Sequence, residues 1–192
     1  ADVCRRLRAD GYSDWIHERT GLIPDAYFSA TKIAWILRHC GRAGELLQKG
    51  RLRAGTIDTY LVWRLTEGRR FVTDATNASR TMLYNIHTME WDEELLRLFG
   101  VPREILPEVI DSDACAGETN VLGCMIPIFG IAGDQQAALF GQCCFEPGKA
   151  KNTYGTGCFL LMNIGSEPAV SEKNLLTTVA YRAGGRTAYA LE

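Results

Sequence analysis

The sequence predicts a mixed α/β fold in two parts, and three observations support this prediction. Before about residue 117, apolar residues recur at helical spacing between helix-capping residues and terminal glycines. After that point, short apolar and β-branched runs typical of strands dominate. Glu146-Pro147-Gly148 then interrupts the chain. We therefore expect residues 1–144 to form one α/β domain and residues 145–192 to begin a second.

Helices are expected mainly in the first half of the chain. Ser29 and Asp92 stand where helix caps are expected, and Gly21 and Gly100 stand where helices end. The expected helices cover residues 3–10, 14–19, 29–39, 56–66 and 93–99, and a helical turn covers 102–106. In the helix over 56–66, the apolar stripe is expected to contain Ile57, Tyr60, Leu61 and Leu65. Residues 41–55 are typical of a surface loop or a loose helix.

Strands are expected mainly in the last third of the chain. The expected strands cover residues 71–73, 126–132, 149–154, 159–164, 175–181 and 187–191. The run over 126–132 is mostly apolar and indicates a buried strand. Two adjacent glycines, Gly184 and Gly185, predict a hairpin turn between the last two strands.

The composition is that of an ordinary globular protein. Hydrophobic residues make up 46% of the 192 residues and charged residues 23%, and the formal net charge is −2. This balance gives no electrostatic footprint for nucleic acid. No apolar run approaches the length of a membrane span, and no signal peptide is visible. We therefore expect a cytoplasmic protein that binds neither nucleic acid nor a membrane.

The cysteines agree with that location. The chain has seven cysteines, an odd number, and no C-x-x-C pair. Reduced, mostly buried thiols are the simplest interpretation. None of the three histidines falls at ligand spacing near a cysteine pair, so the pattern does not predict a zinc site.

One carboxylate is presented by a strand, a glycine turn and a helix. Gly133 follows the strand over 126–132 and would allow a sharp turn, and Asp134 stands at the expected N-cap of a helix. A second glycine turn over 153–159 follows about twenty residues later. A fixed base beside such a turn suits phosphoryl transfer, in which positioning and charge handling do most of the work. On these residues alone, an ordinary helix cap would be the preferred interpretation of Asp134.

Several long motifs carry a family resemblance. Residues 27–39, YFSATKIAWILRH, resemble the first signature pattern of the FGGY carbohydrate kinases. Residues 73–83, 85–88, 130–142 and 151–159 resemble the glycerol kinases within this family. Because these motifs are long, independent and in the right order, the resemblance is specific, and it runs from about Asp14 to the last residue.

The resemblance implies both a fold and a reaction. The fold would be of the actin/hexokinase-like, or ribonuclease H-like, type, with two α/β domains and the active site in the cleft between them. This chain would be a central fragment, holding the back part of the first domain and the opening strands of the second. The reaction would be the ATP-dependent phosphorylation of glycerol to sn-glycerol 3-phosphate with Mg²⁺, releasing ADP. The fragment alone is expected to be inactive.

The resemblance also implies roles for four residues around the acceptor. Asp134 would be the catalytic base and would lie near the magnesium ion. Gln135 and Tyr27 would contact glycerol hydroxyls, and Phe159 would form an apolar wall against the glycerol carbons. Each residue has a simpler interpretation, because Gln135 could be a solvated glutamine of a first helical turn, Tyr27 a half-buried loop tyrosine and Phe159 a core phenylalanine.

The second glycine turn would bind the nucleotide. By resemblance, Thr156 and the backbone of Gly155 and Gly157 would contact its phosphates, since glycine lets N–H groups approach anionic oxygens closely. A plain hairpin turn is the alternative. Some bacterial glycerol kinases bind fructose 1,6-bisphosphate through a glycine-rich loop and an arginine just before the catalytic strand. Residues 120–125 are shorter and lack that arginine, so this regulation is expected to be absent or weak.

Two other functions stay open on the sequence. One is phosphorylation of another polyol or sugar, such as xylulose or gluconate, by a kinase of the same family. The other is a non-catalytic, nucleotide-binding module with an actin-like fold, which the Asp134-Gln135 pair argues against. Whether copies of the chain form a homo-oligomer is also left open.

Overall fold

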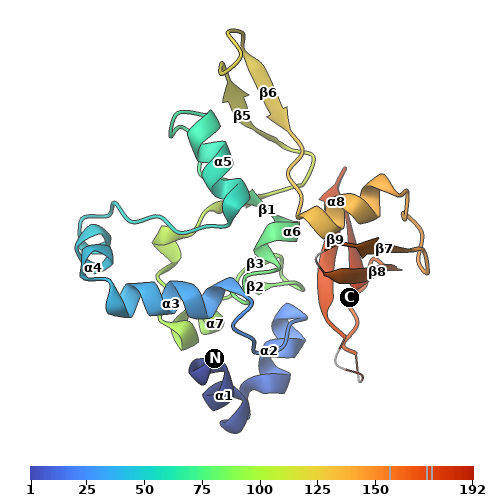
Figure 1. Cartoon of the computed structure of the whole chain (residues 1–192), viewed down its shortest axis with the longest axis horizontal. Helices are drawn as coiled ribbons and strands as arrows, with labels where there is room; N and C mark the ends of the chain where they lie inside the picture. Colours follow the sequence, from blue (N-terminus) through green and yellow to red (C-terminus); the bar gives the residue numbers. More distant parts are fainter. Residues whose placement is uncertain (156, 172, 174) are drawn as a thin grey trace.

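The structure, a computed structural model, describes residues 1–155, 157–171, 173 and 175–192. Helices occupy most of the first half (Figure 1). They are α1 (Asp2–Ala9), α2 (Tyr12–Thr20), α3 (Ser29–His39), α4 (Gly41–Gln48), α5 (Ile57–Leu65), α6 (Ala75–Ala78), α7 (Glu93–Phe99), the 3-10 turn η1 (Arg103–Ile105) and α8 (Asp134–Gly141).

Strands form one larger sheet and three small ones. The strands are β1 (Val72–Asp74), β2 (Tyr84–Asn85), β3 (Glu90–Trp91), β4 (Glu108–Ile110), β5 (Cys115–Thr119), β6 (Ile126–Phe129), β7 (Ala150–Tyr154), β8 (Cys158–Gly165), β9 (Thr177–Ala183) and β10 (Arg186–Leu191). The larger sheet is antiparallel with the order β7-β8-β10-β9. β1 pairs with β4 in parallel, while β2 pairs with β3, and β5 with β6, in antiparallel fashion.

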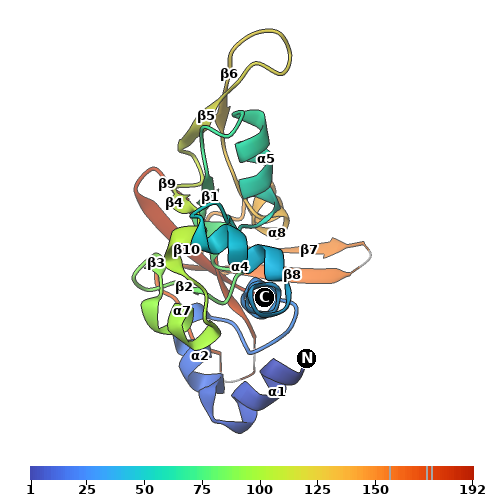
Figure 2. The ribbon, with the colours of Figure 1, turned by 90° about the vertical axis from the view of Figure 1, so that its left-hand side faces the viewer.

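Figures 1 and 2 show how these parts are arranged. Helix α8 packs against β7, β8 and β9. The β5–β6 hairpin projects away from the body, beside α5, and α1 lies at the opposite end. Within the described part of the chain, no helix combines the length and the apolar character needed to cross a membrane.

The β9–β10 hairpin connects the sheet to the helical part. Its partners come from four separate segments that precede α8 in the chain, so it is held by contacts distant in sequence. The hydrogen bonds are Thr177 N to Gly21 O at 2.8 Å, Ser112 N to Arg182 O at 2.6 Å, Tyr189 Oη to Ile86 O at 2.6 Å, and a 3.1 Å contact between the Ser79 and Thr178 hydroxyls.

The main core lies between this hairpin and the helices. Val179 and Tyr189 of the hairpin are buried in one apolar cluster with residues of α2, α3, α7 and the segment after α6. Its fully buried members include Ile16, Leu22, Ala30, Met82, Leu83, Tyr84 and Leu95. A smaller cluster joins Leu139 of α8 to Leu161, Ala180, Ala188 and Ala190 of the sheet. Burial of this apolar surface is the main force that docks α8 onto the strands.

Signals that depend only on neighbouring residues predicted the elements well. The Asp92 side chain caps α7 by accepting hydrogen bonds from the N–H groups of Glu94 and Leu95, and Gly100 ends the helix in the left-handed region. Gly184 and Gly185 both have positive φ, as a tight hairpin turn with this twist requires. These predictions are confirmed, whereas the predicted cap Ser29 is wrong, because Phe28 is the N-cap of α3 and Ser29 is the first residue of that helix.

The predicted apolar stripe of α5 is wrong. Ile57 is 69% exposed, Tyr60 and Leu61 are also exposed, and the buried residues of α5 are Thr59 and Val62. The reason is tertiary, because α5 turns the Thr59–Val62 side toward β1 and β5. Residues 41–55 are also more regular than expected at their start, where α4 forms.

The strand before the glycine turn is not buried as predicted. β6 ends at Phe129, pairs only with β5, and leaves the Phe129 side chain 64% exposed. Ile128 packs against the cluster that contains Val62 of α5, but the other face of this projecting hairpin, which carries Phe129, is open to solvent, so apolar residues in this strand do not make it a core strand (Figure 1).

Candidate functional site

The turn that carries Asp134 differs from the predicted one in two details. Gly133, rather than Asp134, is the N-cap of α8, and Asp134 is the first residue of the helix. The φ of Gly133 is −59°, which any residue can adopt, so its backbone freedom is not what the turn requires. A Cβ at this position would lie 2.4 Å from Gln136 Oε1, so any other residue here would require the Gln136 side chain to move.

Buried hydrogen bonds hold this turn in place. The N–H of Gly133 donates to Thr76 Oγ1 at 2.8 Å, and the Thr76 hydroxyl donates in turn to the carboxylate of Asp74. Asp74 is fully buried and also accepts a hydrogen bond from Ser112 Oγ at 2.7 Å. On the other side, Gln136 Nε2 donates to Thr178 Oγ1 at 3.0 Å. The start of α8 is therefore anchored to both α6 and β9.

A cavity of about 430 Å³ opens in front of this turn. It brings together the four residues predicted to surround the acceptor, namely Tyr27, Asp134, Gln135 and Phe159, which come from three distant parts of the chain. The roles of these residues stay predictions. The other lining residues are Ile57, Asp58, Leu61, Asn77, Arg80, Ala132, Gly133, Gln136 and Glu192.

The four predicted residues differ in their surroundings. Tyr27 is 64% exposed and meets Phe28 edge to face, with ring centroids 5.4 Å apart. The Gln135 amide donates from Nε2 to Asp134 Oδ2 at 3.2 Å, so the carboxylate and the amide lie side by side. Phe159 is partly buried and packs beside the cluster that contains Leu139 and Leu161.

Three further charged residues line the cavity, and the sequence analysis did not identify them as site residues. Arg80 and Glu192 form an ion pair at 2.8 Å, and the Arg80 guanidinium lies 5.4 Å from the Phe28 ring centroid. Asp58 accepts a hydrogen bond from Thr73 Oγ1 at 2.7 Å, and burial raises the pKa of its carboxyl. Of these three residues, only Arg80 lies in a recognised motif, the block over residues 73–83.

A buried lysine behind the cavity was also missed. Lys151 lies on β7, and its ammonium donates to Gln135 Oε1. Burial lowers the pKa of this ammonium, while the nearby carboxylates of Glu192 and Asp134 raise it. A lysine in a strand usually reaches solvent, so the inward direction of this side chain could not be predicted from the residue type.

The second glycine turn lies next to Phe159. A Cβ on Gly157 would approach Phe159 Cε2 to 2.6 Å, so the turn packs directly on the ring that lines the cavity. The N–H of Gly155 donates to Gly157 O at 2.9 Å across the turn and is used within it. Thr156, the third residue predicted to bind the nucleotide, lies outside the described residues.

The donor set around Asp134 fits magnesium better than a tightly caged metal. Among the residues that the structure describes, no group of three or more His, Cys, Asp or Glu side chains could hold a metal ion. Magnesium in phosphoryl-transfer sites is held by one or two carboxylates, with water and phosphate oxygens completing its shell. The exposed carboxylate of Asp134, which lines the cavity, matches this pattern.

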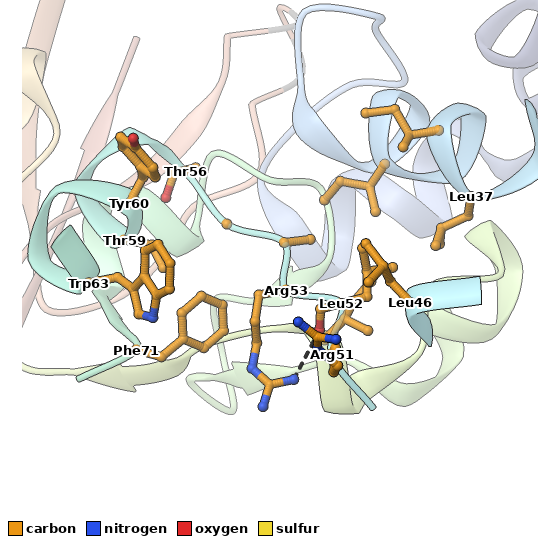
Figure 3. Close-up of a pocket in the computed structure, with 15 residues that line it drawn as sticks. Leu37, Leu46, Arg51, Leu52, Arg53, Thr56, Thr59, Tyr60, Trp63 and Phe71 are labelled. Carbon is orange, nitrogen blue, oxygen red and sulfur yellow. Dashed lines mark hydrogen bonds between the residues drawn. The ribbon is translucent and has the colours of Figure 1, made fainter. Parts of the chain in front are cut away.

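Not every hollow in the molecule has such chemistry. A mainly apolar one of about 530 Å³ lies between α3, α5 and the segment after α4, where Tyr60, Trp63, Phe71 and Leu52 line it (Figure 3). It contains no carboxylate. Its exposed aromatic side chains agree with the observation that α5 turns apolar residues away from the core.

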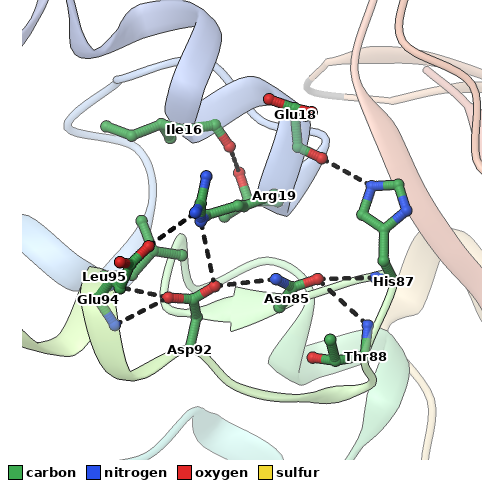
Figure 4. A network of polar contacts seen from close by, with 10 residues as sticks. Ile16, Glu18, Arg19, Asn85, His87, Thr88, Asp92, Glu94 and Leu95 are labelled. Atoms are coloured by element: carbon green, nitrogen blue, oxygen red, sulfur yellow. Dashed lines mark hydrogen bonds and ion pairs between the residues drawn. The ribbon is translucent and has the colours of Figure 1, made fainter.

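The polar groups around His87 form a structural network. His87 Nε2 lies 2.7 Å from Glu18 O, and Asn85 bridges the backbone N–H of His87 to Asp92 (Figure 4). Arg19 completes the network through Asp92 and Glu94. His39 Nδ1 likewise lies 2.9 Å from Trp35 O. Both histidines therefore have backbone partners, as expected of hydrogen-bonded rather than ligand histidines.

The segment compared with the fructose 1,6-bisphosphate loop is the tip of the β5–β6 hairpin. Residues 120–125 connect these two strands, and Val121 and Leu122 are exposed there. The expectation that this regulation is absent or weak stays a prediction.

Comparisons with known proteins agree with this geometry. The chain is 58% identical to a glycerol kinase of Bradyrhizobium diazoefficiens over its whole length, and it spans about 39% of the length of that relative. Among solved structures, it is similar to Plasmodium falciparum glycerol kinase with ADP, with a TM-score of 0.93, 36% identity, and 99% of this chain and 39% of the other covered. A xylulose kinase of Lactobacillus acidophilus matches with a TM-score of 0.82 and 21% identity, covering 99% of this chain and 38% of the other, which supports the fold alone.

These matches confirm the expected fold, which is of the actin/hexokinase-like α/β type. The model of the FGGY family of carbohydrate kinases, N-terminal domain, matches residues 1–141. This match covers most of the chain and includes Tyr27, Asp134 and Gln135. The chain therefore belongs to the FGGY family of carbohydrate kinases.

Proposed function

We propose that the complete protein transfers the γ-phosphoryl group of ATP to glycerol, giving sn-glycerol 3-phosphate and ADP. The observation that carries this proposal is the cavity in which Tyr27, Asp134, Gln135 and Phe159 meet. Placed hydroxyl and amide groups beside an apolar wall are what a small polyol requires. The similarity to glycerol kinases over the whole chain supports glycerol as the acceptor.

Asp134 acts as the general base. An acceptor hydroxyl oxygen forms a bond to the γ-phosphorus while the bond from that phosphorus to the bridging oxygen of ADP breaks. The hydroxyl proton passes to the Asp134 carboxylate. Gln135 and Tyr27 orient the acceptor, and Phe159 packs against its carbons.

The second glycine turn would hold the nucleotide phosphates, and Asp134 would hold the metal. Gly155, Thr156 and Gly157 contact the phosphates, and the packing of Gly157 on Phe159 supports this arrangement by placing the turn beside the cavity. Mg²⁺ neutralises phosphate charge when it is bound, and Asp134 is the residue that holds it.

The domain boundary and the location belong to the same proposal. Residues 1–144 form the back of the first domain, and residues 145–192 begin the second, nucleotide-binding domain. The change from helices to a four-stranded antiparallel sheet at β7 supports this division. All seven cysteines are free thiols, which supports a reducing, cytoplasmic location.

The test uses the complete gene product that carries this sequence, with ADP release measured over glycerol, xylulose and gluconate. We expect turnover with glycerol, and we expect Asp134→Asn to lower kcat by roughly 10²- to 10⁴-fold, the usual contribution of a general base. Asp10→Asn, an exposed carboxylate after α1, is the matched control and should be unaffected. Preference for another acceptor, or normal turnover by Asp134→Asn, would overturn the proposal.

A further inference from the structure

The buried ammonium of Lys151 is the group outside the predicted site that most needs an explanation. Its residue is only 2% exposed, although moving a charged amine out of water is costly. The ammonium has three N–H donors and three acceptors in the structure, Gln135 Oε1, Thr153 Oγ1 at 2.8 Å and Phe159 O at 3.2 Å. All of its donors are therefore satisfied, and two of its three partners belong to candidate site residues.

The contact with Gln135 fixes the polarity of that amide. An ammonium can only donate hydrogen bonds, so it pairs with the amide oxygen and cannot pair with the NH₂ group. With Oε1 held by Lys151, Nε2 faces the other way and donates to Asp134 Oδ2 at 3.2 Å. Without the lysine, the amide could rotate by half a turn and present its oxygen to the Asp134 carboxylate, which would be repulsive.

We propose that Lys151 is a positioning residue for phosphoryl transfer, which holds the Gln135 amide with its NH₂ group toward Asp134 and the cavity. This inference rests on the function proposed above. In this orientation, the amide donates to the acceptor oxygen while Asp134 takes the proton of the same group. A hydroxyl can both accept the first hydrogen bond and donate the second, so the Lys151–Gln135–Asp134 row suits an alcohol acceptor.

A lysine with only a structural role would be equally buried, so the test must show whether Lys151 acts through Gln135. A double-mutant cycle with Lys151→Met and Gln135→Ala does this in the complete gene product. We expect each single variant to lower kcat/KM for glycerol about 10- to 100-fold, the usual effect of losing a residue that orients a ligand group. The kcat/KM of the double variant should be within about threefold of that of Gln135→Ala, because the amide that Lys151 orients is already absent from Gln135→Ala. Lys149→Met, an exposed lysine just before β7, is the control and should keep wild-type kinetics.

Gln135→Glu tests the direction of the amide separately. Glutamate has the same shape and keeps the contact with the Lys151 ammonium, so the variant should fold with an unfolding temperature at or above wild type. It removes the NH₂ donor and adds a charge beside Asp134, so kcat/KM should fall at least tenfold. If Lys151→Met does not fold, Gln135→Glu alone tests the proposed orientation of the amide. The proposal would be overturned by an unchanged kcat/KM in Gln135→Glu. It would also be overturned if the fold loss of kcat/KM in the double variant equalled the product of the losses in the two single variants.

Failure of the proposed function gives a different result from failure of the role proposed for Lys151. If the wild-type protein phosphorylates another polyol or sugar instead of glycerol, the cycle is measured with that acceptor, and the role of Lys151 is supported or overturned there. If no acceptor is phosphorylated, the cycle is measured on thermal unfolding. Coupled effects on unfolding would then support the Lys151–Gln135 contact, and additive effects would overturn it.

Discussion

His17 shows how a single buried side chain can make stability depend on pH. It lies in α2 with 7% exposure, and among the described residues its Nε2 has no hydrogen-bond partner. Burial lowers the pKa of the imidazole below its ordinary value of 6.5, although the nearby Asp14 acts in the opposite direction. The unfolded chain therefore binds a proton at His17 at a higher pH than the folded chain does.

We expect the free energy of unfolding to decrease as the pH falls through 6.5, because protonation then favours the unfolded chain. The decrease should stop below the folded pKa, and its slope from this residue cannot exceed about 1.4 kcal/mol per pH unit. Urea unfolding between pH 7.5 and 5 would measure it. His17→Gln should flatten the profile, while His39→Gln, which changes an exposed histidine, should not. An identical slope in wild type and His17→Gln would contradict this expectation.

At the residue scale, sequence reasoning found the groups that stand in long motifs and missed those that depend on packing. Tyr27, Asp134, Gln135 and Phe159 belong to recognisable blocks, and the structure gathers them in one cavity. Lys151 also lies in such a block, but its role depends on β7 facing the first turn of α8. That relation between elements is invisible in a list of residue types.

At the element scale, the start of α8 depends on a helix nearly sixty residues earlier. Gly133 N–H donates to Thr76 Oγ1, and replacing that hydroxyl by a methyl group would leave a partly buried donor without its acceptor. Thr76→Val should therefore lower the free energy of unfolding by about 1–3 kcal/mol. It should also lower kcat of the complete protein, because the turn that carries Asp134 loses its anchor.

Chemical denaturation and steady-state kinetics would measure the two effects. Thr88→Val is the matched control, since Thr88 is exposed and its hydroxyl makes no hydrogen bond among the described residues. Equal stability of the two variants would show that the contact between α6 and α8 contributes little.

Elements set by adjacent residues were predictable, and those set by distant contacts were not. The caps of α7 and the Gly184-Gly185 turn follow from local chemistry. β6 was mistaken for a core strand because its apolar content resembles that of a buried strand, although its neighbour is a single strand of a hairpin. The prediction of the buried side of α5 was wrong for the same reason, since packing against β1 and β5 determines which side of this helix faces inward.

At the scale of the whole molecule, the helical half and the sheet meet where α2 ends. Gly21 has a φ of +70°, its carbonyl accepts from Thr177 N, and a Cβ there would lie 2.2 Å from Thr177 O. The contact is with backbone of β9, which cannot move aside without shifting the hairpin that Ser79, Ile86 and Ser112 also hold. A side chain at this one position should therefore disturb the docking of the two halves.

Gly11 provides the comparison that isolates this effect. It caps the start of α2 with a φ of +83°, and nothing lies within 4 Å of the Cβ position. Gly11→Ala should lower the free energy of unfolding by about 1–2 kcal/mol, the cost of a left-handed conformation alone. Gly21→Ala adds the clash with β9 and should lower the free energy of unfolding by more than about 4 kcal/mol, a loss that only a few severe mechanisms cause. Denaturant unfolding of both variants measures the difference. Equal losses of unfolding free energy would mean that the backbone at the α2–β9 junction shifts at little cost to accommodate a methyl group.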